Sequence, residues 1–254
     1  MDLLIYILLF VFGSIMGSFF HVVSTRLSNN ESIVFPPSHC HNCNHRLKWY
    51  ELIPIVSYII QGGKSRCCKN KLPISYLIIE IVTGALYCVN YHSFGFGIEF
   101  FIGLVFISAL IIVIVSDIEY MIILDEVLYI AGALIVAISF IGYGFTETIY
   151  HIGYGLLAFL TMYLIKIIGD FLFKKESLGG GDIKLMFLFG IVLGYPLSVS
   201  TIFLATFIAF PMALIIMFMH KDHLIPFGPF LSMSAILIFI SKIDFMDIIN
   251  YLTR

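Results

Sequence analysis

Long uninterrupted apolar segments constrain this chain more than any other feature. A helix of about 20 apolar residues crosses the hydrocarbon core of a bilayer, and a backbone in lipid must satisfy its own hydrogen bonds. The sequence therefore predicts an all-α polytopic membrane protein with about eight transmembrane helices. The approximate bounds of the eight segments are 3–23, 74–91, 97–116, 122–142, 149–169, 183–197, 200–219 and 225–241.

The composition agrees with a membrane protein and argues against other classes. The 254 residues are 60% hydrophobic and 12% charged, which is far more apolar than a soluble domain requires. The net charge is −2, and no basic tail suggests nucleic-acid binding. Segment 3–23 has neither a basic region before it nor a small-residue cleavage site after it, so we expect a retained helix rather than a signal peptide.

Residues 24–73 differ in kind from the rest of the chain. They hold seven of the fourteen Lys and Arg residues and four of the five cysteines. We therefore expect three parts: a first transmembrane helix (1–23), a basic cysteine-containing loop domain (24–73) and a transmembrane domain (74–254). Because cytoplasmic loops carry the excess of Lys and Arg, we expect the loop domain in the cytoplasm.

Two aspartates stand at the edges of apolar segments. Asp117 follows the third segment, and Asp182 precedes the sixth, directly after three glycines at 179–181. An ionised carboxylate at the centre of a membrane helix costs roughly 2.5–3.5 kcal/mol on insertion scales, and less near the interface. Counting helices from a cytoplasmic loop domain places both aspartates on the cytoplasmic side. The glycines permit an extended substrate to approach Asp182 closely.

Two carboxylates that meet can hydrolyse a peptide bond without a metal. One takes a proton from water while the other gives a proton to the carbonyl oxygen, and such a pair shares one proton because both cannot ionise comfortably. Each aspartate also has a structural interpretation: Asp182 as a helix N-cap, and Asp117 as an interfacial residue that ends a helix. Glu119, Asp125 and Glu126 compete for the second catalytic role, and Asp125 can instead cap a helix or orient the loop.

The loop domain carries a candidate metal site. Cys40 and Cys43 form a C-x-x-C motif, and Cys67 and Cys68 follow after twenty-three intervening residues. Two such pairs predict a structural zinc ion, because a loop this small cannot bury a core of its own. A metal-free loop and a disulfide are the alternatives, and a cytoplasmic location argues against the disulfide. Three histidines can replace a missing ligand: His39, His41 and His45.

Together these motifs resemble the prepilin leader peptidases, which are membrane aspartyl proteases of the GxGD type. Residues 179–184 resemble the second catalytic motif of that family. Residues 117–125 resemble the first, with Leu124 in place of the usual proline. Segments 17–26 and 225–230 resemble further family motifs, so the resemblance extends over nearly the whole chain.

The resemblance implies an enzyme of the bacterial cell membrane that cuts the short basic leader from prepilins or pseudopilins at the cytoplasmic face. Asp117 and Asp182 are then the catalytic pair, and 74–254 is the aspartyl peptidase domain. Proteolysis would use no cofactor. Many family members also methylate the new amino terminus, which makes S-adenosylmethionine a candidate second substrate. The implied partners are the precursor protein and the bilayer.

The chain departs from the family pattern at two places in its amino-terminal part. Family members often carry C-x-x-C in both halves of the loop, whereas here Ser65 occupies the third cysteine position and Cys67 is additional. His21 stands where the family usually has Asn. These departures bear on methyl transfer more than on proteolysis.

Two rival functions explain part of the sequence. A proton-coupled transporter also uses intramembrane acids, but it needs acids near the bilayer centre and an internal repeat, and the sequence shows neither. A non-enzymatic scaffold with a zinc knuckle explains the cysteines, but it leaves Asp182 after three glycines as a coincidence. Only a cleavage assay separates a scaffold from an enzyme.

Overall fold

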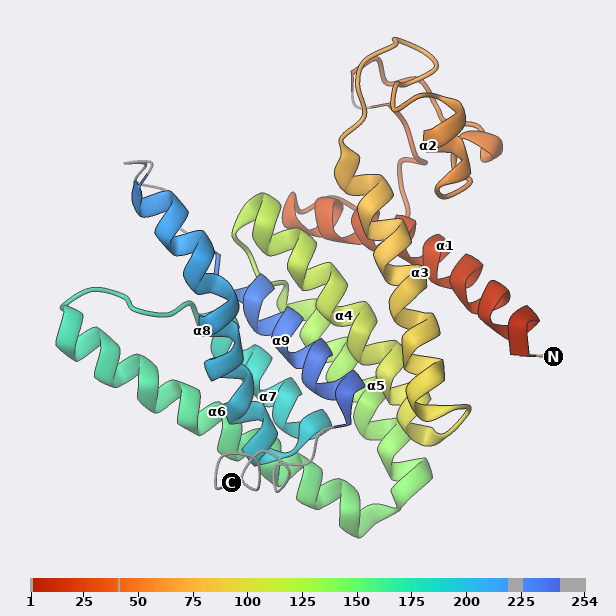
Figure 1. The fold of residues 1–254 in the computed structure, drawn as a ribbon. Coiled ribbons are helices and arrows are strands. Elements are labelled where there is room, and N and C mark those ends of the chain that lie inside the picture. Colours follow the sequence, from red (N-terminus) through yellow and green to blue (C-terminus); the bar gives the residue numbers. More distant parts are fainter. Residues whose placement is uncertain (1, 41, 219–225, 243–254) are drawn as a thin grey trace. The chain divides into compact units, whose positions relative to one another are not determined.

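The computed structural model describes residues 2–40, 42–218 and 226–242. Over these ranges it contains helices and two isolated β-bridges but no sheet, which confirms the all-α prediction (Figure 1). The elements are α1 (Asp2–Ser28), the 3-10 helix η1 (Trp49–Glu51), α2 (Val56–Ile60), α3 (Ile74–Phe94), α4 (Ile98–Tyr120), α5 (Asp125–Tyr143), α6 (Phe145–Phe173), α7 (Gly180–Leu193), α8 (Tyr195–Phe218) and α9 (Gly228–Ser241).

Among the described residues, six helices are long and apolar enough to cross a membrane, and they are α1, α3, α4, α5, α6 and α8. Helices α7 and α9 have 14 residues each. At about 1.5 Å per residue each is about 21 Å long, which is shorter than the hydrocarbon core of about 30 Å. Each of the eight predicted segments thus contains a helix, but two of these helices are short.

The boundary between the sixth and seventh segments was predicted wrongly. We expected it between residues 197 and 200, whereas α7 ends at Leu193 and α8 begins at Tyr195. Gly194 between them has φ of +78°, a conformation that glycine adopts readily and that ends a helix. Pro196 then lies in the first turn of α8, where its missing N–H costs no helical hydrogen bond.

The chain divides into two compact units, Met1–His92 and Ser93–Arg254. In the first, α1 and α3 pack closely where Gly13 meets Gly84, since a Cβ on Gly13 would lie 2.8 Å from the Gly84 Cα. Small residues permit such approach between helices in lipid. The residues between α1 and α3 form a lobe with η1 and α2. The three-part division expected from the sequence stays a prediction.

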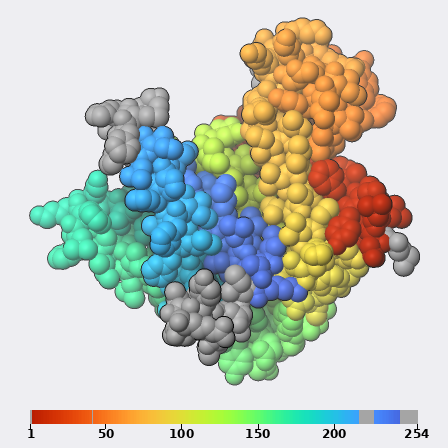
Figure 2. Space-filling model, in the orientation of Figure 1, coloured from red at the N-terminus to blue at the C-terminus, as the bar shows by residue number. Residues whose placement is uncertain are grey.

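The second unit is built around α4, which packs on α5 and α9, and α7, which packs on α5, α6, α8 and α9. Phe106 of α4 and Phe189 of α7 are completely buried, with ring centroids 5.9 Å apart. By contrast, α8 lies at the surface (Figure 2) and exposes Phe203 and Phe207, as lipid-facing helices do. This packing brings the end of α4 to the starts of α7 and α9.

Candidate active site

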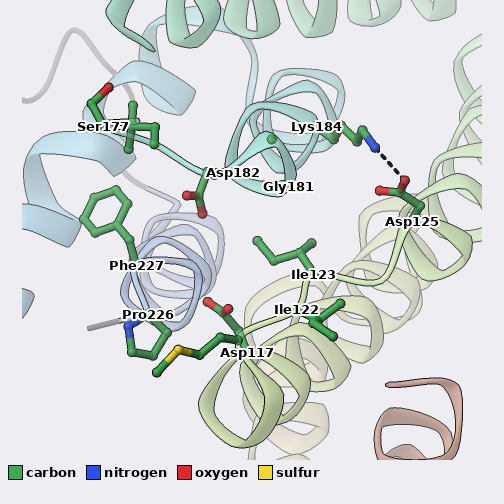
Figure 3. Close-up of a pocket in the computed structure, with 14 residues that line it drawn as sticks. Asp117, Ile122, Ile123, Asp125, Ser177, Gly181, Asp182, Lys184, Pro226 and Phe227 are labelled. Carbon is green, nitrogen blue, oxygen red and sulfur yellow. Dashed lines mark hydrogen bonds and ion pairs between the residues drawn. The ribbon is translucent and has the colours of Figure 1, made fainter. Parts of the chain in front are cut away.

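Asp117 and Asp182, the predicted catalytic pair, line one hollow in the second unit (Figure 3). The hollow has a volume of about 590 Å³. Its walls come from the end of α4, the connection 121–124, the start of α5, residues 177–184 and the residues that lead into α9. Two motifs far apart in the sequence therefore meet at one place.

Asp117 lies in the last turn of α4 and is only 6% exposed. The helix ends at Tyr120 because Met121 adopts a left-handed conformation, and its N–H bonds back to the Asp117 carbonyl. The backbone N–H of Gly228, in the first turn of α9, donates a hydrogen bond to the Asp117 carboxylate. A Cβ at residue 228 would lie 2.5 Å from Asp117 Oδ2, so a larger residue there would displace the carboxylate.

Asp182 is the third residue of α7, and Gly179 is the N-cap. The interpretation of Asp182 as the N-cap is therefore wrong, because the helix begins one turn earlier than that role requires. The carboxylate instead reaches back and accepts a hydrogen bond from the Gly179 N–H, as the acid of a capping box does. Its Oδ1 is buried and has no hydrogen-bond partner among the described residues.

The two carboxylates point toward the same space between α4 and α7 (Figure 3). The charge on Asp117 acts unfavourably on a charge at Asp182. Two such groups cannot both ionise comfortably, so the pair is suited to hold one proton between them. A buried oxygen without a partner is costly, which suits a site that binds water or a substrate carbonyl.

The connection 121–124 is fastened to α7 at two points. Ile123 fills the space beside Gly181, where a Cβ would lie 2.6 Å from the Ile123 Cβ. Next to it, Lys184 Nζ forms an ion pair with Asp125 Oδ2 at 2.5 Å. Both contacts fix the segment that follows Asp117 relative to the start of α7.

The structure also distinguishes the competing acids. Asp125 begins α5, whose N-cap is Leu124, so the prediction that Asp125 caps this helix is wrong. Its ion pair with Lys184 agrees instead with a role in orienting the loop. Glu119 and Glu126 are exposed and do not line the hollow.

The functional contacts of Gly228 and Ile123 were not predicted from the sequence. Gly228 lies inside the segment 225–230 that resembles a family motif, which was the only signal for it. Ile225 falls outside the described residues, so the structure shows this motif only from Pro226 onward.

The predicted metal ligands form a second cluster, in the lobe of the first unit. The Sγ atoms of Cys40, Cys43, Cys67 and Cys68 all lie within 4.8 Å of one another, and all four thiols are free. In a tetrahedral zinc site with Zn–S bonds of about 2.3 Å, the sulfur atoms are about 3.8 Å apart. This donor set therefore fits a zinc ion, and none of the four cysteines forms a disulfide in this structure.

Two turns with the same hydrogen-bond pattern carry these cysteines. The Cys40 N–H bonds to the His45 carbonyl, and the Ser65 N–H bonds to the Asn70 carbonyl in the same way. Isolated β-bridges flank both turns, His39 with Arg46 and Lys64 with Lys71. Ser65 therefore holds the place that corresponds to Cys40, in agreement with its predicted position.

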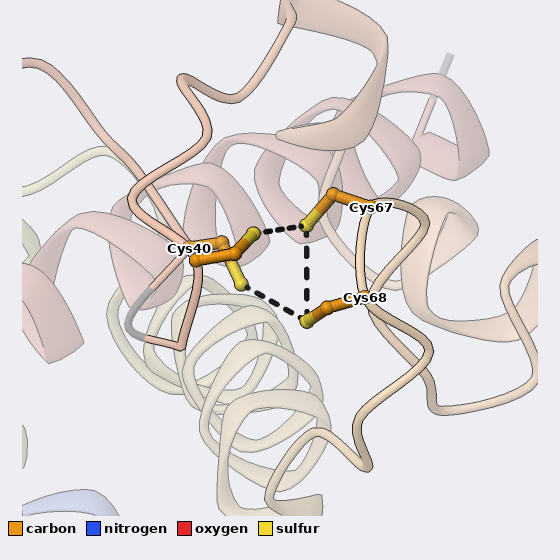
Figure 4. Close-up of side chains that lie close together, drawn as sticks. Cys40, Cys67 and Cys68 are labelled. Atoms are coloured by element: carbon orange, nitrogen blue, oxygen red, sulfur yellow. Dashed lines mark hydrogen bonds between the residues drawn. The ribbon is translucent and has the colours of Figure 1, made fainter.

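The additional cysteine, Cys67, lies beside Ser65 in this cluster. Cys67 Sγ lies 2.9 Å from Ser65 Oγ and 3.1 Å from Cys43 Sγ. Cys67 and Cys68 both point toward the turn that carries Cys40 (Figure 4). The Ser65 hydroxyl beside Cys40 lowers the pKa of that thiol to about 6, whereas Cys67 beside Cys43 raises the pKa of the Cys43 thiol to about 12.

Histidine ligands are not needed to complete this set. The cluster of metal-binding groups among the described residues contains the four cysteines and neither His39 nor His45. His39 Nδ1 instead contacts the Pro37 carbonyl at 3.1 Å. His41 lies outside the described residues.

Comparisons with known proteins agree with this arrangement. The Bacterial Peptidase A24 N-terminal domain matches residues 11–94, and the Type IV leader peptidase family matches residues 104–217, a range that contains both Asp117 and Asp182. No solved structure matches the chain.

Curated relatives cover the chain almost completely. It is 33% identical over 245 residues to the prepilin leader peptidase/N-methyltransferase of Bacillus subtilis (strain 168), covering 92% of this chain and 93% of that protein. It is 30% identical over 207 residues to the protein of the same description from Klebsiella pneumoniae, covering 78% and 89%. The Vibrio cholerae relative is 28% identical over 258 residues, covering 93% and 97%. The resemblance seen in the motifs is thereby confirmed, and the chain belongs to the type IV leader peptidase family.

Proposed function

We propose that this protein removes the leader peptide from type IV prepilin or pseudopilin precursors, with Asp117 and Asp182 as its catalytic residues. The relatives are named for this activity. The observation that carries the residue assignment is the meeting of the two carboxylates in one hollow, with the buried Asp182 Oδ1 lacking a partner among the described residues.

The proposed reaction needs one ionised and one protonated carboxyl group. The ionised group takes a proton from water as the water oxygen attacks the scissile carbonyl carbon, and the protonated group gives its proton to the carbonyl oxygen. Collapse of the tetrahedral intermediate breaks the C–N bond, and the leaving nitrogen takes a proton from the pair. No covalent intermediate with the enzyme forms. We assign the roles of general acid and general base to the pair as a whole, because the two carboxyl groups titrate together.

The hollow suits an extended peptide. Nothing lies within 4 Å of the position that a Cβ on Gly180 would occupy, so the backbone here is open to a substrate. Met121, Leu178 and Phe227 line the same hollow and offer apolar contacts. These surroundings agree with a precursor whose cleavage site precedes a hydrophobic helix, as the family resemblance implies.

The chain is a multi-pass membrane protein, and we propose that its active site faces the cytoplasm of a bacterial cell. The support is the density of Lys and Arg in residues 24–73, which predicts a cytoplasmic lobe. Because the helices alternate in direction, the 117–125 and 170–182 connections are then expected on the same side.

Two further proposals concern small molecules. The names of the relatives include N-methyltransferase, so we propose that the new amino terminus also accepts a methyl group from S-adenosylmethionine. We also propose that Cys40, Cys43, Cys67 and Cys68 bind a structural zinc ion, which would hold the two turns together. Proteolysis itself is proposed to use no cofactor.

Mass spectrometry of a precursor tests the activity directly. Purified protein in lipid vesicles would be incubated with a pilin-like precursor, first alone and then with S-adenosylmethionine. We expect loss of the leader in both samples and an added methyl group in the second only. A precursor that stays intact over a panel of pilin-like substrates, with a folded and correctly inserted enzyme, would refute the peptidase assignment.

A further inference from the structure

The lobe between α1 and α3 exposes a group of large apolar side chains. Trp49 is 77% exposed, Ile60 is 68% exposed and Ile59 is 64% exposed. Leu52 and Val56, between them in sequence, are also exposed. The surfaces of soluble proteins rarely expose so many large apolar side chains within one short segment unless a partner or a membrane covers them. We call residues 49–60 the apolar segment.

Two basic side chains, Lys48 and Arg66, lie against the apolar segment. Tyr50, Ile53, Val56 and Ile60 line a small hollow of about 140 Å³ that Arg66 also borders. The Arg66 guanidinium lies 5.2 Å from the centroid of the Tyr50 ring, and Lys48 Nζ lies 6.0 Å from it. Glu51, the one acid within residues 48–66, accepts a hydrogen bond from the Lys48 backbone N–H.

The apolar segment lies beside the first turns of a membrane-spanning helix. The Ile55 N–H donates a hydrogen bond of 2.6 Å to Glu80 Oε2. Glu80 is six residues past Ile74, where α3 begins, and it is therefore about 9 Å along the helix. Ile55 therefore contacts a side chain from the first two turns of α3.

The first turns of α3 also expose apolar side chains. Ile74 is 64% exposed and Ile78 is 50% exposed. Exposed isoleucines on a helix that is long and apolar enough to cross a membrane are expected to face lipid. The apolar segment therefore lies near the depth at which α3 enters the bilayer.

We propose that the apolar segment is a lipid-binding face that docks on the anionic surface of the bilayer. Trp49, Leu52, Val56, Ile59 and Ile60 enter the boundary between headgroups and acyl chains, where Trp and amphipathic segments are favoured. Lys48 and Arg66 contact the anionic headgroups, which attract basic residues next to a membrane.

A bilayer suits this surface better than a soluble partner does. Both ends of the lobe continue into helices that can cross the membrane, α1 and α3, so the segment is always held near the lipid surface and docking is intramolecular. The basic charge of the lobe complements anionic lipid. The proposal concerns the first unit and stands independently of the catalytic assignment.

Trp49 is the only tryptophan in the chain, so its fluorescence reports on this surface without interference. The full-length protein would be reconstituted in vesicles of phosphatidylcholine and phosphatidylglycerol, with bromine atoms placed at a shallow position on the acyl chains. We expect strong quenching by the brominated lipid, blue-shifted emission and protection from iodide in the aqueous phase.

Charge variants test the headgroup contacts. Lys48→Gln and Arg66→Gln are each expected to weaken docking in phosphatidylglycerol vesicles by about fivefold, because one basic residue near an anionic surface contributes that order of attraction. Lys71→Gln, an exposed cation elsewhere in the lobe, is the matched control and is expected to change docking less. Equal losses in all three variants would overturn the assignment to Lys48 and Arg66.

Two results would overturn the lipid-binding face itself. One is a Trp49 that emits like indole in water, is quenched by iodide and is unaffected by brominated lipid. The other is a Trp49 that becomes protected only when a precursor peptide is added, which would make this surface a peptide-binding site. Circular dichroism of each variant would verify that it remains folded.

Discussion

The aspartate hollow and the cysteine cluster are built in opposite ways. The hollow is formed by the ends of buried helices, and backbone contacts fix its geometry, with Gly228 against Asp117 and Gly181 against Ile123. The cysteine cluster lies in a lobe with few regular elements, where short turns present side chains to one another. The hollow therefore leaves little room for a different side chain, whereas the cysteine cluster leaves more room for one.

Two departures from the family pattern, Ser65 and Leu124, follow this difference. In the lobe, a cysteine position holds Ser65, and Cys67 supplies a thiol from two residues further along. At the hollow, residues 117–125 and 179–184 resemble the family motifs, and the change at Leu124 stands at the N-cap of α5 rather than against a carboxylate. In this chain a cysteine cluster carried by turns has shifted one donor by two residues, whereas the departure near the aspartates touches neither carboxylate.

The largest effect is expected from the aspartates themselves. Asp117→Asn and Asp182→Asn should each lower the rate of precursor cleavage by about 10²–10⁴-fold, because each removes one half of the acid–base pair. The double variant should be hardly worse than either single variant, since residues that act as a unit are not additive. Single-turnover cleavage in vesicles would measure these rates.

Glu119→Gln is the matched control, because this acid lies in the same helical turn as Asp117 but outside the hollow. It should cleave at the wild-type rate. Equal losses in the Glu119 and Asp117 variants would show that the charge of the turn, rather than the hollow, matters for cleavage.

A smaller loss is expected when the backbone contact is disturbed. In Gly228→Ala the new Cβ would lie 2.5 Å from Asp117 Oδ2, so the carboxylate must move. A displacement of about 1 Å can cost about 10²-fold in rate. Gly132→Ala is the control, since its nearest neighbour would be a side-chain carbon of Leu188 at 3.9 Å. Wild-type cleavage by the Gly228 variant would contradict the role of this contact.

The ion pair between Asp125 and Lys184 should matter less again. Its side chains are 44% and 38% exposed, and an exposed pair contributes up to about 1 kcal/mol, or about fivefold. Asp125→Asn should therefore reduce cleavage by a few fold, and exchanging the charges with Asp125→Lys and Lys184→Asp should restore part of the loss. A loss as large as that of Asp182→Asn would instead identify Asp125 as a catalytic carboxylate.

The smallest effect is expected from moving a thiol within the lobe. Ser65→Cys combined with Cys67→Ser returns the second turn to the C-x-x-C pattern, and we expect the metal content of the purified protein to remain unchanged. Cys40→Ser removes one of the four thiols and should lower the bound metal sharply. Elemental analysis after purification measures both, and loss of metal in the exchanged variant would show that Cys67 is required at its own position.

The sequence predicted the chemistry of the site better than its geometry. Asp117 and Asp182 were identifiable because a carboxylate beside an apolar segment is costly and unusual. The contact between Gly228 and Asp117 was not predictable, since helical periodicity says nothing about which helix ends meet. The same limit explains Asp182, which a cap preference placed one turn too early in the helix.

Helix number was predictable from hydrophobicity, but helix length was not. Apolar residues continue from α7 through Gly194 into α8, so composition alone shows no clear boundary, and only the positive φ of Gly194 ends the helix. In the lobe, the spacing of the cysteines predicted a cluster. The sequence did not predict that Cys67 points inward beside Ser65, because this orientation depends on the fold of the turn.

The pH dependence of single-turnover cleavage tests the central claim most directly. If one carboxyl group must be ionised and the other protonated, the rate falls at low pH, where both are protonated, and also at high pH, where both are ionised. We predict a bell-shaped profile with two limbs for the wild-type enzyme, measured on a precursor whose own ionisable groups lie far from the cut. A rate that rises through a single limb and then stays constant would show that one base suffices, and it would contradict a reaction shared by Asp117 and Asp182.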